Sequence, residues 1–132
     1  MVLILDASAL IAYLEKEPGY EKVKEILARA SETEQKILMT SVNWGEICYV
    51  LLKHYSREEA ERILNIVQTF PIEIVTVDQN LAKQAAIYKA TQRLPYVDSF
   101  AAALTKLHNG ELVTGDREFS VVKSEIKILW VK

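Results

Sequence analysis

The 132-residue chain has little cysteine, no long hydrophobic run and no basic leader segment. Its one cysteine, Cys48, cannot form an internal disulfide, which excludes a disulfide-stapled secreted scaffold and is typical of a reducing compartment. The apolar runs are strand-length or interrupted by charge, so none is long enough to span a bilayer. Residues 1–6 have no small-residue cleavage site and are typical of a strand. We therefore expect a cytoplasmic protein with no membrane partner.

Histidine and net positive charge are also scarce. The two histidines, His54 and His108, form no cluster with Cys48, which argues against zinc, and no Ser-His-Asp or Cys-His arrangement is evident. The net charge is −2, whereas proteins that bind nucleic acid through a broad surface are usually basic. A nucleic acid would therefore have to be held locally, by a few Lys or Arg side chains or by a metal ion.

The composition is that of an ordinary globular protein. Half of the residues are hydrophobic and 26% are charged, which argues against disorder. A chain of this length has no room for a second core of useful size. No internal repeat, low-complexity tract or linker interrupts it. We expect one domain over residues 1–132.

Strand-like and helix-like segments alternate along the chain. Short apolar or β-branched runs predict strands, and apolar residues at helical spacing predict helices between them. The predicted strands cover residues 2–5, 37–39, 72–77, 112–114 and 126–131. The predicted helices cover residues 7–15, 20–30, segments following Thr40 or Ser41, Ser56 and Asp78, and residues 98–108. This alternation predicts an α/β fold around a mainly parallel sheet.

Four acidic residues lie at or near the ends of these strands. Asp6 directly follows the first strand, and Asp116 lies two residues beyond Thr114 at the end of the fourth. Glu46 lies early in the helix after the second strand, and Asp98 starts the helix that leads into the fourth. Because ligands of such sheets bind beyond the carboxyl ends of the strands, we expect the four acids to converge at one edge.

Taken alone, each of these acids has a simpler interpretation. An Asp at a helix start is usually an N-cap, and Asp78, which also follows a strand, is interpreted as a cap only. As a group the four acids are not explained as caps, since two carboxylates about 5 Å apart repel by roughly 3 kcal/mol at an effective dielectric constant near 20. A divalent cation removes this cost, and ligands that are all oxygen suit Mg²⁺ or Mn²⁺.

Short motifs surround the four acids. They read Leu-Asp6-Ala-Ser8, Ser41-Val-Asn-Trp-Gly-Glu46, Asp98-Ser-Phe-Ala-Ala-Ala and Thr114-Gly-Asp116-Arg-Glu-Phe119. In this order and spacing, over nearly the whole chain, the sequence resembles the PIN-domain ribonucleases. It resembles most closely the VapC-type toxins of bacterial and archaeal toxin–antitoxin pairs.

The resemblance implies a fold and a set of site residues. The fold would be a five-stranded sheet in the order 3-2-1-4-5 flanked by helices, which places Asp78 at the edge of the sheet and away from the site. The residues implied to be both catalytic and metal-binding are Asp6, Glu46, Asp98 and Asp116, here called the acidic quartet. Ser8 and Thr114 would be polar supports, and Glu118 stands where relatives often carry Asp.

The resemblance also implies an activity and partners. The activity would be hydrolysis of RNA phosphodiester bonds by water activated by one or two Mg²⁺ or Mn²⁺ ions. The partners would be an RNA substrate, a cognate antitoxin protein and a second copy of the chain in a homodimer.

Two other classes of function compete with this one. A catalytically silent PIN-like module that binds RNA or protein has no need of four clustered acids. A phosphatase of the aspartyl-nucleophile type would carry a second acid where this chain has Ser8, and a receiver domain would carry an acidic pair at the same strand end.

Overall fold

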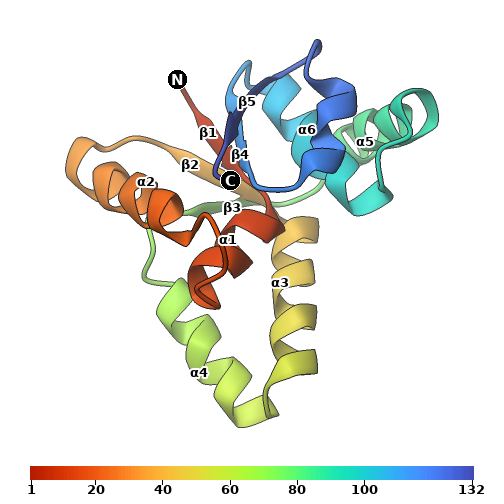
Figure 1. Cartoon of the computed structure of the whole chain (residues 1–132). Helices are drawn as coiled ribbons and strands as arrows, with labels where there is room; N and C mark the ends of the chain where they lie inside the picture. The colour runs from red at the N-terminus through yellow and green to blue at the C-terminus, as the bar shows by residue number, and fades with distance from the viewer.

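Five short strands form the centre of the structure (Figure 1). The computed structural model describes all of residues 1–132. The strands are β1 (Leu3–Leu5), β2 (Ile37–Thr40), β3 (Glu73–Val75), β4 (Glu111–Thr114) and β5 (Lys127–Trp130). They pair in the order β3-β2-β1-β4-β5, and every pair is parallel. The predicted fold class and strand order are confirmed.

Helices cover both faces of this sheet (Figure 1). They are α1 (Ala7–Leu14), α2 (Tyr20–Thr33), α3 (Ser41–His54), α4 (Arg57–Val67), α5 (Gln79–Gln92), α6 (Tyr96–Leu107) and the short 3₁₀ helix η1 (Arg117–Val122). No helix combines the length and the apolar composition that a membrane crossing requires.

Each face of the sheet has its own hydrophobic core. Successive side chains of a strand point to opposite faces, so Leu5 packs with α1, α2, α3 and α4, while Ile4 packs with α5, α6 and η1. Both residues are fully buried. The central strand β1 is therefore covered on both sides, as its continuous apolar sequence predicts.

Polar side chains between strands and helices cap the helices as predicted. Thr40 Oγ1 accepts a hydrogen bond from Asn43 N at 3.0 Å at the start of α3. Asp78 Oδ1 accepts one from Leu81 N at 2.8 Å at the start of α5, after the edge strand β3. The interpretation of Asp78 as a helix cap at the sheet edge is confirmed.

The start of α6 differs from the prediction. The helix begins at Tyr96, two residues before Asp98, because Pro95 has a φ of −54° that leads into a helix and because its carbonyl oxygen accepts from Ser99 N at 3.0 Å. Asp98 therefore lies within the first turn and does not cap the helix. The bounds of the other elements shift by one to three residues, where helix and strand ends are locally least defined.

Gly110 marks a point where the chain leaves no space for a side chain. A Cβ atom there would lie 2.5 Å from Val2 O and 2.8 Å from Ile4 Cδ1, between the α6–β4 turn and β1. We expect Gly110→Ala to lower the free energy of unfolding by about 1–3 kcal/mol through overpacking. Chemical denaturation of the two proteins measures the difference.

Gly45 supplies the matched control, because nothing lies within 4 Å of the Cβ position in the middle of α3. There the helix propensity of Ala should raise the stability by up to about 1 kcal/mol. Equal effects of the two substitutions would contradict the tight approach of Gly110 to β1.

Candidate active site

Asp6 lies at the carboxyl end of β1, in the middle of the sheet, with a side chain only 2% exposed. Its carboxylate accepts hydrogen bonds from Thr114 Oγ1 at 2.5 Å, from Ala9 N at 2.9 Å and from Ser8 Oγ at 2.9 and 3.0 Å. Burial raises the pKa of Asp6 to about 6, although these hydrogen bonds act in the opposite direction. The acid is thus costly to ionise here and is fixed in one orientation.

Thr114, at the end of β4, connects Asp6 to Asp116. While its hydroxyl donates to Asp6, its oxygen accepts from Asp116 N at 3.0 Å, and Ser8 Oγ lies 3.3 Å away. Asp116 in turn caps η1, since its Oδ1 accepts from Glu118 N at 2.9 Å. Ser8 and Thr114, which the sequence suggests as polar supports, therefore both contact the Asp6 carboxylate.

Asp98 and Glu46 approach the same point from α6 and α3. Burial, and after it the carboxylates of Asp116, Asp6, Glu46 and Glu118 in that order, raise the pKa of Asp98 to about 7. Burial and then Asp116 raise the pKa of Glu46. The structure thus brings the acidic quartet into one electrostatic cluster, with Glu118 at its periphery.

Asn43 is a positioning residue of this cluster to which the sequence analysis assigns no role. Its side chain is buried, and Nδ2 donates to Val97 O at 3.2 Å, which ties the first turn of α3 to the first turn of α6. Asp98 lies on that turn of α6 and Glu46 on the following turn of α3, so the bond fixes one acid relative to the other. The motif Ser41-Val-Asn-Trp-Gly-Glu46 contains Asn43, but its partner lies 54 residues away in the chain.

The acids open into a cavity of about 230 Å³ between α1 and α3. Its walls consist of Ala7, Ser8, Ile11, Glu15, Glu17, Glu46, Val50, His54, Asp98 and Asp116. A neighbouring hollow of about 380 Å³ shares Ser8, Glu17 and Asp116 with it and adds Gly115, Arg117 and Lys132. Asp6 lies beneath the cavity. Glu15, Glu17 and His54 are not predicted from the sequence, because they reach the cavity only through the packing of α1 against α3.

Arg117 brings a positive charge close to the acids. Its guanidinium stacks 4.3 Å from the ring centroid of Trp130 and donates to Lys132 O at 2.7 Å. These two contacts hold the cation at the rim of the hollow beside Asp116.

The donor set fits a hard divalent cation. Only carboxylate and hydroxyl oxygens meet at the cluster, and the pKa values of three of the four acids are raised. No three acidic, His or Cys side chains are placed to hold an ion by themselves. Mg²⁺ needs no such cage, since it keeps several waters and typically binds through one or two carboxylates.

Comparison with known proteins finds a matching family and several relatives. Residues 3–125 match the family model described as PIN domain. Ribonuclease VapC42 of Mycobacterium tuberculosis is 26% identical over 84 residues, which cover 64% of this chain and only 61% of the length of that relative.

Solved structures share the fold over nearly the whole chain. DNA-bound VapBC from Salmonella typhimurium has a TM-score of 0.82 at 18% identity, covering 100% of this chain and 99% of that one. VapBC2 from Rickettsia felis, bound to a promoter DNA fragment, has a TM-score of 0.80 at 16% identity and covers 98% of both chains.

The raised pKa of Asp98 predicts that ionisation of this group lowers the folding stability of the metal-free protein. A carboxyl group whose pKa is higher in the folded than in the unfolded state lowers stability as pH rises between the two values, here from about 4 to about 7. Asp98→Asn removes this cost, so in EDTA it should stabilise the protein above pH 7 and not near pH 4. Because Asp98 is partly exposed, we expect a gain of only about 1–2 kcal/mol.

Thermal unfolding of both proteins across this pH range measures the gain. Asp78→Asn is the matched control, because Asn caps a helix as well as Asp and residue 78 lies outside the cavity. A gain in stability for Asp98→Asn that is the same at pH 4 and pH 8 would contradict the idea that ionised Asp98 destabilises the metal-free protein.

Proposed function

Since the chain belongs to the PIN domain family, we propose that it is a Mg²⁺- or Mn²⁺-dependent endoribonuclease that hydrolyses RNA phosphodiester bonds. The observation that carries the proposal is the convergence of Asp6, Glu46, Asp98 and Asp116 at the carboxyl ends of β1 and β4. The similarity to Ribonuclease VapC42 supports RNA as the substrate.

The acidic quartet would hold the metal. Glu46, Asp98 and Asp116 face the cavity, and Asp6 adds its charge from beneath. When bound, such an ion polarises a phosphoryl oxygen, supplies water of lowered pKa and neutralises charge on the phosphate. The cation also makes a strongly negative cavity able to accept RNA despite the net charge of −2.

The chain itself contributes positioning. Thr114, Ser8 and the backbone of Ala9 fix the Asp6 carboxylate, and Thr114 also fixes the backbone of Asp116. These hydrogen bonds keep the acids in place before any ligand arrives. A prearranged site of this kind loses less free energy to reorganisation when the substrate binds.

We further propose that the protein is the toxin of a toxin–antitoxin pair, with an antitoxin protein as its partner and the cytoplasm as its place of action. The likeness in fold to the VapBC structures supports this role. A homodimer is supported by exposed apolar side chains on one helix, since Tyr49 and Leu52 of α3 are 62% and 48% exposed. The aromatic side chain of Tyr13 on α1 packs against Phe70 within the chain and is not part of this exposed surface.

Metal-dependent cleavage of RNA tests the proposed function. Purified protein, free of any partner, is incubated with end-labelled total RNA and Mg²⁺ or Mn²⁺. We expect discrete products that disappear in EDTA and in Asp98→Asn, because both treatments remove the cation or its ligand. Asp78→Asn, which alters a helix cap outside the cavity, should cleave like the wild type.

Two results would contradict the proposal. Unimpaired cleavage by Asp98→Asn would show that the acidic quartet is not needed for the reaction. Absence of cleavage by the wild type with both metals would favour the catalytically silent PIN-like binding module.

A further inference from the structure

The cavity at the acids runs between α1 and α3 and is here called the α1–α3 groove. Each of these two segments lines it with three side chains spaced by about one helical turn: Ser8, Ile11 and Glu15 on one wall and Glu46, Val50 and His54 on the other. Eight residues of α-helix rise about 12 Å, so His54 lies about that far along α3 from Glu46. The groove therefore has an acidic end at the proposed reaction site and a distal end at His54.

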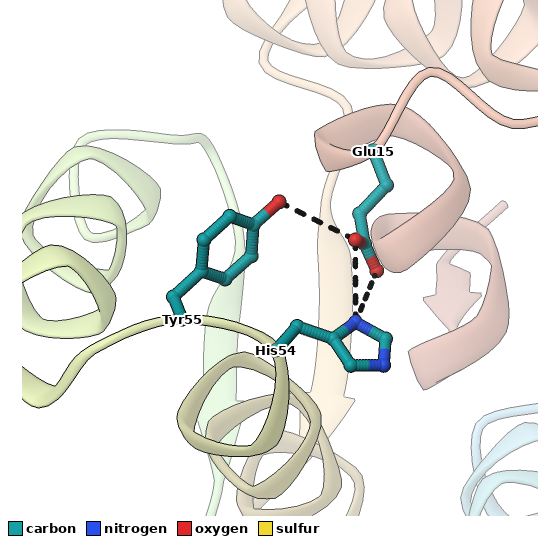
Figure 2. Close-up of polar contacts among 3 residues, drawn as sticks. All are labelled: Glu15, His54 and Tyr55. Atoms are coloured by element: carbon teal, nitrogen blue, oxygen red, sulfur yellow. Dashed lines mark hydrogen bonds and ion pairs between the residues drawn. The ribbon is translucent and has the colours of Figure 1, made fainter.

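Three side chains form a fixed cluster at the distal end (Figure 2). His54 Nδ1 lies 3.2 and 3.3 Å from the two carboxylate oxygens of Glu15, and the hydroxyl of Tyr55 donates to Glu15 Oε2 at 3.3 Å. The side chain of Glu15 is 17% exposed and that of His54 is 46% exposed. The cluster thus holds a partly open imidazole with a well-packed carboxylate.

The contact with Glu15 determines which nitrogen of His54 is free. A carboxylate can only accept hydrogen bonds, so Nδ1 carries the proton that is shared with Glu15. Nε2 lies on the side of the ring away from Glu15 and contacts neither Glu15 nor Tyr55 (Figure 2). Because His54 lines the cavity, Nε2 can form one hydrogen bond with a ligand there.

The walls between the two ends are suited to a base and not to a phosphate. Ile11 lies between Ser8 and Glu15 along the α1 wall, and Val50 lies between Glu46 and His54 on α3. Both side chains are apolar. Glu15 and Glu17 line the same cavity, and their negative charges would repel a phosphate. A flat heterocycle with apolar faces and a polar edge matches apolar walls that end in one hydrogen-bonding nitrogen.

We propose that the α1–α3 groove binds the base of a nucleotide that flanks the cleaved phosphate, with Ile11 and Val50 against the base and His54 Nε2 bonded to its edge. This subsite rests on the proposed ribonuclease function and deepens it. It makes His54 a determinant of sequence preference, and Glu15 and Tyr55 its positioning residues. The phosphate chain itself would pass over the acids at the other end of the groove.

A cleavage-preference assay tests the subsite. A pool of single-stranded RNAs, randomised on both sides of a site that the wild type cleaves, is digested with Mn²⁺, and sequencing of the products gives relative kcat/KM for each base at each position. For His54→Ala we expect about ten-fold loss of discrimination at one flanking position, equivalent to one hydrogen bond of about 1.4 kcal/mol. At the other positions, discrimination should stay within about two-fold of the wild type, because sites that share no contact with His54 are independent of it.

A second variant reaches the groove without touching the cluster. Val50→Leu adds one methylene to the wall, so it should shift the preference at the same flanking position toward the smaller pyrimidines. His108→Ala is the matched control, because His108 caps the far end of α6 and lines no part of this cavity. Its preferences should equal those of the wild type, and thermal unfolding should show that all variants are folded.

The outcomes separate the subsite from the proposed function. If His54→Ala lowers cleavage of every RNA equally, or changes nothing, the cluster only ties α1 to α3 and the subsite is wrong. The same conclusion follows if His54→Ala and Val50→Leu change preferences at different positions. Absence of cleavage by the wild type overturns the proposed function and the subsite together, whereas cleavage with unaltered preferences overturns the subsite alone.

Discussion

The buried carboxylate of Asp6 is the feature around which the site is organised. A charge at the centre of a sheet is expensive unless hydrogen-bond donors surround it, and Ser8, Ala9 and Thr114 supply them. Thr114 belongs to β4, so this requirement also ties the end of β4 to the end of β1. Asp116 follows two residues later and is held by the same threonine.

The parallel topology explains why the other acids arrive at the same place. The carboxyl ends of β1, β2 and β4 lie side by side, and α3 begins directly where β2 ends. Asn43 then binds the carbonyl of Val97 and brings the first turn of α6 to the first turn of α3. Burial, and then repulsion by the neighbouring carboxylates, raises the pKa of Asp98, so the fold maintains a concentration of negative charge that a divalent cation would relieve.

Much of this arrangement follows from local features of the sequence. Apolar runs ending in Asp6 and Thr114 predict buried strands with polar ends, and helical spacing separates them, so the α/β class follows from the residues. The strand order, and with it the separation of Asp78 from the four acids, comes from the resemblance to the PIN-domain ribonucleases. The helix α6 begins two residues before Asp98, its predicted start, because the backbone of Pro95 already leads into the helix.

The remaining parts of the site depend on contacts between distant residues. Glu15 and His54 are 39 residues apart, and neither carries a local signal that separates it from an ordinary surface charge. Only the packing of α1 beside α3 places them at one end of a groove whose other end holds the acids. For the same reason the sequence does not distinguish Asn43 from an ordinary helix residue, because its partner Val97 is distant in the chain. Side-chain partners of this kind are set by tertiary packing and not by propensity.

The acidic quartet gathers like charges in a partly buried site, and the proposed divalent cation would relieve their repulsion. The most direct test is the thermal unfolding midpoint of the wild type and of Asp98→Asn as Mn²⁺ is titrated at pH 7.5, with no RNA present. In the wild type we expect the midpoint to rise by several degrees with Mn²⁺, since binding to the folded state stabilises the protein, and in Asp98→Asn we expect a much smaller rise. An equal rise in both proteins, or none in the wild type, would contradict the binding of a cation by the acidic quartet.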